Sequence, residues 1–181
     1  MEVTPQTHLE HRERHTVRDG RPLLFLVSLI VVILDRLSKL WVEAHVQQGR
    51  SIILIPKVFR ISHVLNTGAA FSLFAESLSS KTVRNVLIGF SIVAIIVVLG
   101  MLWTTGRRFS TSALALALIL GGAIGNLYDR VRFSYVIDFL AVRIYHYNWP
   151  DFNVADSCIV IGACLLLIEI FRPQPAETQI L

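Results

Sequence analysis

The sequence is poor in cysteine and in charge, and both shortages narrow the class of protein. Only two of its 181 residues are cysteine, Cys158 and Cys164, and their spacing of six excludes a CxxC motif and argues against a disulfide framework. Charged residues make up 17% of the chain against 54% hydrophobic residues, and the mean hydropathy is +0.60. A soluble domain of this length does not need so many apolar residues in unbroken runs, so the composition predicts a membrane protein.

Motifs of familiar catalytic sites are also missing. The sequence has no Ser-His-Asp arrangement, no H-E-x-x-H zinc motif and no Gly-rich phosphate loop. His8, His11 and His15 are spaced like weak metal ligands, but they lie on a polar tail that reads as disordered, so we predict no metal site. The net charge of +4 would suit nucleic acid, yet basic residues also flank membrane spans and meet anionic lipid, and we expect no nucleic-acid partner.

What the sequence does contain is four apolar runs, each near the roughly 17–25 residues that cross a bilayer as a helix. They cover about residues 23–42, 83–103, 112–127 and 154–171. The sequence therefore predicts an all-α membrane bundle of four transmembrane helices over residues 22–172. Residues 1–21 form an N-terminal tail without a cleavable signal peptide, and residues 173–181 form a C-terminal tail.

The connection between the first two runs has a different pattern. Residues 48–78 contain β-branched and aromatic stretches broken by Pro56 and Gly68. This pattern predicts a β-rich loop of short strands that lies on the membrane surface.

Basic residues near the ends of the runs predict the orientation. They precede the first run, fill the turn between the second and third, and follow the fourth, as Arg12, Arg14, Arg18, Arg21, Arg107, Arg108 and Arg172. An even number of spans puts all of them on one side, which we expect to be the cytoplasm. Both termini are then cytoplasmic, and the β-rich loop is extracytoplasmic. Six other basic residues fall on the outer side, so the asymmetry is incomplete.

Polar residues inside the first run form a pair. Asp35 and Lys39 in "LDRLSKLW" are at i and i+4 and so share a helix face. An ionised group at membrane depth is costly unless it is paired. We therefore expect a mutual ion pair that anchors the helix end, with a direct catalytic role as the alternative.

Two further motifs carry candidate binding residues. In "LNTGAAFS", Asn66 offers an amide and Gly68 permits a turn, so the segment is either a grip on an extended peptide or a simple β-turn. In "GGAIGNLYDR", small residues recur every four positions and allow close helix packing. Asn126 and Arg130 follow at i and i+4 on one face, whereas Asp129 points elsewhere, toward another basic group.

Two acids stand at the outer ends of the last two runs. Asp138 lies in "YVIDFL" beyond the third run, and Asp156 lies in "FNVADS" at the start of the fourth. Because these runs are antiparallel neighbours, the two carboxyl groups can meet, share a proton and act as an acid and a base in water activation. Taken singly, Asp156 would be a helix N-cap and Asp138 a surface acid. Spacing in the sequence leaves both interpretations open.

Taken together, these motifs resemble one family, the bacterial lipoprotein signal peptidases (signal peptidase II). The resemblance extends from about residue 22 to residue 172 and rests on five motifs in order, "DRLSK", "NTGAAFS", "GGAIGNLYDR", "VIDF" and "FNVADS". It implies a four-span aspartyl peptidase of the bacterial cytoplasmic (inner) membrane that removes signal peptides from prolipoproteins. Cleavage is expected just before a cysteine that carries a diacylglyceryl group. The acids and water suffice for this reaction, so no cofactor is expected.

The resemblance also implies roles for individual residues. Asp138 and Asp156 match the catalytic pair. The positions expected to bind the substrate, or the peptide antibiotic globomycin, are Asn66, Gly68, Asn126, Arg130 and Asn153. Asp35, Lys39 and Asp129 match supporting positions. The expected partners are lipid-modified prolipoproteins and membrane lipids, and the enzyme is expected to be a monomer.

Two alternatives come from other classes. A small proton-coupled transporter would also place acids in membrane segments, but it would favour the middle of the membrane and two related halves, and no internal repeat is visible. A noncatalytic scaffold would need no pair of acids, and asparagine at either position would then be silent.

Overall fold

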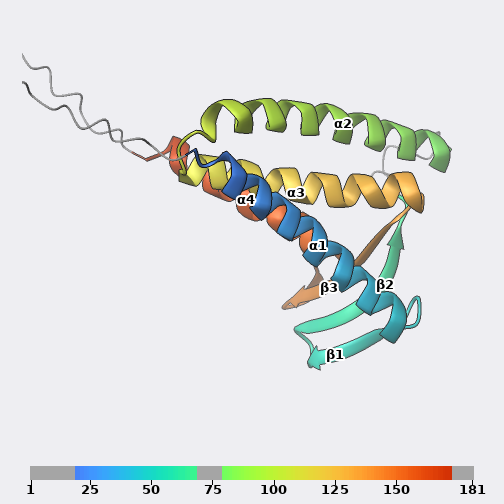
Figure 1. The fold of residues 1–181 in the computed structure, drawn as a ribbon. Helices are drawn as coiled ribbons and strands as arrows, with labels where there is room; N and C mark the ends of the chain where they lie inside the picture. The colour runs from blue at the N-terminus through green and yellow to red at the C-terminus, as the bar shows by residue number, and fades with distance from the viewer. Residues whose placement is uncertain (1–18, 69–78, 173–181) are drawn as a thin grey trace, which may run out of the picture.

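The structure is a computed structural model that describes residues 19–68 and 79–172. Within these ranges it has four helices and four strands (Figure 1). Their order along the chain is α1 (Arg21–His45), β1 (Ser51–Ile55), β2 (Phe59–Asn66), α2 (Ser80–Thr105), α3 (Thr111–Arg132), β3 (Val136–Ile144), β4 (Tyr147–Asn148) and α4 (Val154–Ile170). The last ten residues of the predicted loop, residues 69–78, lie outside the described residues, as do the tails of residues 1–18, with their three histidines, and 173–181.

The helices begin and end close to the predicted apolar runs, but only two of the described helices are long and apolar enough to cross a membrane. These are α2, over Lys81–Thr105, and α3, over Thr111–Arg132. The most apolar part of α2 has a mean hydropathy of 2.8 and is only 6% buried. Exposing this apolar surface to water is unfavourable, so we expect α2 to be surrounded by lipid. α1 carries internal charges and α4 has 17 residues, so spanning by these two helices stays a prediction.

α3 is the centre of the bundle, because it packs against each of the other three helices. Small residues on α3 permit the contact with α1. The hydroxyl of Ser28 donates a hydrogen bond to the carbonyl of Ala117 at 2.8 Å. A Cβ atom on Gly125 would lie only 2.8 Å from Oδ2 of Asp35. The predicted stripe of small residues therefore brings a charged face of α1 against α3.

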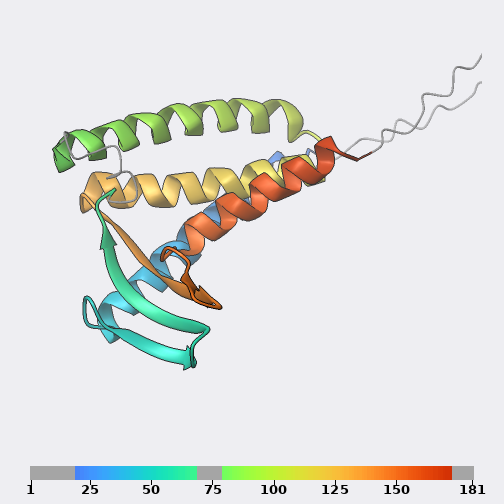
Figure 2. The ribbon, with the colours of Figure 1, turned by 180° about the vertical axis from the view of Figure 1, so that it is seen from behind.

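The sheet is larger than predicted. It is antiparallel, in the order β1-β2-β3-β4, and it lies at the end of the bundle where α1 ends (Figures 1 and 2). β1 and β2 lie within the loop of residues 48–78, whereas β3 and β4 come from the connection between α3 and α4, for which no strand was predicted. The first four residues of β3 are all buried. A strand buried on both faces lacks the alternation that identifies a half-exposed strand in a sequence.

β3 is bonded on both of its edges. β2 pairs with one edge, placing Val64 opposite Asp138. Phe152 covers the other edge, where its carbonyl accepts bonds from the backbone N–H groups of Phe139 at 3.0 Å and Leu140 at 2.8 Å. Phe152 is two residues before α4, so this pairing fixes the beginning of α4 beside the middle of β3.

Candidate active site

Asp138 lies in the buried part of β3 and is held by an asparagine of the neighbouring strand. Asn66 is two residues beyond Val64 on β2, so it is the diagonal neighbour of Asp138 on the same sheet face. Its Nδ2 donates a hydrogen bond to Oδ2 of Asp138 at 2.9 Å. The Asp138 side chain is buried, with 3% exposure for the residue.

Asn153 connects Asp138 with Asp156. It is the N-cap of α4, and its Oδ1 accepts a bond from the backbone N–H of Asp156 at 2.9 Å. The Asp156 carboxylate accepts a bond from the Asn153 backbone N–H at 3.3 Å, which completes a capping box. The Nδ2 of Asn153 donates to Oδ1 of Asp138 at 2.8 Å. Asn153 thus contacts both carboxylates, that of Asp138 through its side chain and that of Asp156 through its backbone N–H, and the N-cap is Asn153 rather than Asp156.

α3 contributes Asn126 and Arg130 to the site around the two acids. Nδ2 of Asn126 donates to Oδ1 of Asp156 at 2.7 Å, and its Oδ1 accepts a bond from Nδ2 of Asn153 at 3.3 Å. Arg130 donates from Nη1 to the backbone carbonyl of Asn126 at 3.1 Å, and its charge interacts with those of Asp156 and Asp138. The structure therefore brings Asn126 and Arg130 together with both acids.

Burial of Asp138 makes its charged form unfavourable and raises the pKa of its carboxyl group to about 6. The neighbouring charge of Asp156 raises this pKa as well. Hydrogen bonds from Asn66 and Asn153 lower it, because both amides stabilise the carboxylate. Asp138 can therefore hold its proton at mildly acidic pH, which the general acid of the reaction requires.

Gly68 fixes the position of Asn66. Its φ is +99°, and its backbone N–H donates to Oδ1 of Asn66 at 2.8 Å, which orients the Asn66 amide toward Asp138. A Cβ atom on Gly68 would lie 2.9 Å from Cγ1 of Val83 in α2. Gly68 is thus part of an asparagine-stabilised turn. The rest of the motif, residues 69–72, lies outside the described residues.

A buried cluster of charged side chains, Asp35, Lys39 and Asp129, contacts the first turn of α4, which carries Asp156. Nζ of Lys39 contacts Oδ2 of Asp35 at 2.7 Å and Oδ2 of Asp129 at 2.6 Å. The three residues are at most 2% exposed. The second carboxylate oxygen of Asp35 accepts a bond from the backbone N–H of Ala155 at 3.0 Å. The cluster therefore holds the first turn of α4, next to Asp156.

Arg36 was not expected among these residues. Its Nη1 is 3.8 Å from Oδ1 of Asp129, and its guanidinium stacks on Phe133 with 4.8 Å between the carbon and the ring centroid. The sequence gives only an indirect indication of the contact between Arg36 and Asp129. Two buried acids, Asp35 and Asp129, need more than one cation, and Arg36 is adjacent to Asp35 in the chain.

An apolar cavity of about 390 Å³ adjoins Asp156. Trp149, Pro150 and Phe152 line it from the segment before α4, and Val160 and Ile161 line it from α4. Within the ranges 19–68 and 79–172, no three histidine, cysteine or acidic side chains are grouped so that they could hold a metal ion. The site thus offers carboxyl groups beside an apolar binding surface.

Comparison with known proteins identifies the family. The sequence profile described as "Signal peptidase (SPase) II" matches residues 27–172. A lipoprotein signal peptidase of Solibacter usitatus is 41% identical over 148 residues, covering 82% of this chain and 90% of the relative. Lipoprotein signal peptidases of Pseudomonas fluorescens and Pseudomonas putida are 40% and 39% identical, covering 87% and 90% of this chain and 92% and 95% of the relatives.

Solved structures of bacterial membrane enzymes share the fold. Two bacterial membrane enzymes determined by the in meso method superpose with TM-scores of 0.75 and 0.72 at 29% and 25% identity. They cover 84% and 86% of this chain, and each is covered to 95% of its own length. The profile match and the curated relatives show that the chain belongs to the signal peptidase II family, the lipoprotein signal peptidases.

Proposed function

We propose that this bacterial membrane enzyme is an aspartyl endopeptidase that removes the signal peptide from diacylglyceryl-modified prolipoproteins, cutting just before the lipid-modified cysteine. Membership of a signal peptidase family supports a peptidase that acts on prolipoproteins. The observation that carries the aspartyl mechanism is Asn153, whose side chain and backbone contact both Asp138 and Asp156. The proton-coupled transporter gains no support from these comparisons.

In the proposed reaction Asp156 is the base and Asp138 the acid. Asp156 is half-buried and borders the open cavity, whereas Asp138 is buried and has the raised pKa. Asp156 removes a proton from water, whose oxygen attacks the scissile carbonyl carbon. Asp138 gives its proton to the carbonyl oxygen. The tetrahedral intermediate then returns that proton to Asp138, the C–N bond breaks, and Asp156 passes its proton to the leaving amine.

The surrounding residues would hold the substrate and the acids in place. We assign substrate contacts to Arg130, whose guanidinium has charge and donors for a peptide carbonyl or for globomycin, and to the amides of Asn66 and Asn126. Gly68 and Asn153 act by positioning Asn66 and the two acids. Asp35, Lys39 and Asp129 support the first turn of α4. Because one chain supplies every group, we propose that the enzyme works as a monomer.

The apolar surfaces fit a lipid-modified substrate. The acyl chains of such a substrate stay in the bilayer, so its scissile bond is confined to the membrane surface. The cavity beside Asp156 would accept the apolar part near the cysteine. Exposed apolar residues of β1 and of the turn after it, Ile53, Leu54, Ile55 and Val58, would rest on the bilayer. We place this side outside the cytoplasm, with both termini in the cytoplasm.

A comparison of two substrates tests this function. Purified full-length protein in lipid nanodiscs is given a diacylglyceryl-modified prolipoprotein and the same prolipoprotein without lipid, and product masses are measured. We expect cleavage of the modified form alone, immediately before the cysteine. Equal cleavage of both forms, or cleavage at another bond, would refute the proposed specificity.

The pH dependence of kcat/KM should report the Asp138 carboxyl group. If Asp138 is the acid, activity falls as pH rises through the pKa of the free enzyme's acid, about 6, because the proton is lost. Asn66→Leu removes a hydrogen bond that lowers this pKa, so the falling limb should move to higher pH. Asn148→Leu, an exposed position on β4, is the control and should leave the limb in place. A limb that stays fixed or moves to lower pH in Asn66→Leu would remove Asp138 from the acid role.

A further inference from the structure

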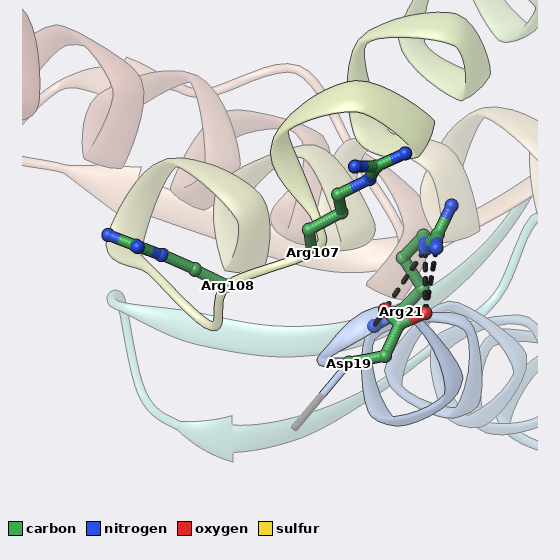
Figure 3. A pocket seen from close by; sticks show the side chains of 4 residues that line it. All are labelled: Asp19, Arg21, Arg107 and Arg108. Carbon is green, nitrogen blue, oxygen red and sulfur yellow. Dashed lines mark hydrogen bonds and ion pairs between the residues drawn. The ribbon is translucent and has the colours of Figure 1, made fainter. Parts of the chain in front are cut away.

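A second cavity, of about 350 Å³, lies at the other end of the bundle from the carboxyl pair. It is lined by Asp19, Arg21, Arg107 and Arg108 (Figure 3). Asp19 and Arg21 stand at the start of α1, and Arg107 and Arg108 form the turn between α2 and α3. None of these residues takes part in the proposed catalytic site.

Backbone contacts fix the two walls of this cavity against each other. The backbone N–H of Gly20 donates to the carbonyl of Arg107 at 3.2 Å. A Cβ atom on Gly20 would lie 3.0 Å from the carbonyl oxygen of Gly106. The turn therefore packs directly on the chain before α1, and the arginines project from a defined backbone.

The lining side chains carry more positive than negative charge. Asp19 is bound by Arg21, whose Nε and Nη2 lie 3.0 and 2.8 Å from its oxygens. These bonds hold the pKa of Asp19 below its ordinary value. Arg107 and Arg108 are exposed, and over residues 19–68 and 79–172 neither of them has an ion pair. Figure 3 shows Arg107 extending toward Arg21, with Arg108 on the opposite side of the turn.

Apolar and aromatic surface surrounds these charges. Trp103 and Phe109 flank the turn with 58% and 55% exposure. The guanidinium of Arg21 stacks on Trp103, with 4.4 Å between its carbon and the ring centroid. The helices that the turn connects, α2 and α3, are the two that are long and apolar enough to span a membrane. Tryptophan and arginine at the end of such helices mark the boundary between lipid and water.

We propose that this cavity binds the phosphate of an anionic phospholipid, with Arg107 as its main contact, Arg21 beside it, and Arg108 adding positive charge from the other side of the turn. A guanidinium binds phosphate oxygens through two parallel N–H donors. Next to the arginines, the end of α2 exposes Leu99, Met101 and Trp103, and this apolar surface suits acyl chains, which a free phosphate ion lacks. The lipid would link the start of α1 to the α2–α3 turn.

Native mass spectrometry of the full-length protein in detergent tests the proposal. The probes are phosphatidylglycerol, zwitterionic phosphatidylcholine and inorganic phosphate, each titrated against the unaltered protein and against Arg107→Gln/Arg108→Gln. The matched control is Arg50→Gln/Arg132→Gln, which removes the same charge from two exposed arginines elsewhere. Thermal unfolding of each variant shows whether it is folded, and Arg107→Lys/Arg108→Lys provides a variant that keeps the charge.

We expect the unaltered protein and the control to retain a first phosphatidylglycerol in preference to phosphatidylcholine. In Arg107→Gln/Arg108→Gln the apparent affinity for that lipid should fall by at least about tenfold, and the lysine variant should lie between. Unchanged affinity in the glutamine variant, or an equal loss in the control, would overturn the site. Inorganic phosphate that displaces the lipid at equal concentration would overturn the lipid as its ligand.

Discussion

Asparagine at Asp138 and at Asp156 should each lower kcat for prolipoprotein cleavage by at least about 10³-fold. The double variant Asp138→Asn/Asp156→Asn should be hardly worse than either single variant. The reason is that the proposed proton transfers need both groups in the same step, so losing the second group removes nothing further. The measurement is single-turnover cleavage of a diacylglyceryl-modified prolipoprotein by purified protein.

The hydrogen bonds around the acids explain why asparagine is the informative substitution. It keeps the size of each side chain and can still accept one bond, from Nδ2 of Asn153 at position 138 and from Nδ2 of Asn126 at position 156. A loss of activity is then attributable to proton transfer rather than to a collapsed site, provided that thermal unfolding is similar. Multiplicative losses in the double variant would mean that the two acids act independently.

Lys39→Met should cost about 3–5 kcal/mol of unfolding free energy. Lys39 is completely buried between Asp35 and Asp129, so removing its charge leaves two carboxylates without their shared cation. Equilibrium unfolding of the purified protein in detergent measures the loss. Cleavage should weaken as well, because Asp35 also binds the backbone N–H of Ala155 in the first turn of α4.

Two further variants separate this effect from a general one. Lys81→Met removes an exposed lysine at the start of α2 and should change the unfolding free energy by less than about 0.5 kcal/mol. Adding Asp129→Asn to Lys39→Met removes one of the stranded charges and should recover part of the loss. If Lys39→Met unfolds like the unaltered protein, the cluster does not stabilise the bundle.

The helices and the polar pairs within them could be predicted because their patterns are local. Apolar runs mark helices, and a spacing of four positions puts Asp35 beside Lys39 in α1, where the two side chains are in contact. The position of Gly125 within a run of small residues likewise indicated the close approach of another helix. Each of these features is set by residues within one or two helical turns of one another.

The contacts that assemble the candidate site are of a different kind. Asn66 and Asp138 are 72 positions apart, and their bond depends on the register of β2 against β3. The strand character of β3 is hidden because both of its faces are buried near Asp138. Phe152 pairs with β3 through backbone groups alone, and any residue type at this position could form these hydrogen bonds, so the sequence does not indicate them. The pairing of strands, and with it the position of Asn153, therefore had to come from the structure.

The most direct test of the proposed mechanism compares two neighbouring acids. Asp151 borders the same cavity as Asp156 and is half-buried, but its carboxylate accepts a bond from the hydroxyl of Ser62 at 2.6 Å instead of joining the carboxyl pair. Purified unaltered protein, Asp156→Asn and Asp151→Asn are given the same diacylglyceryl-modified prolipoprotein. The mechanism predicts cleavage before the lipid-modified cysteine by the unaltered protein and by Asp151→Asn, and none by Asp156→Asn. Equal cleavage by Asp156→Asn would contradict it, as would no cleavage by folded, unaltered protein.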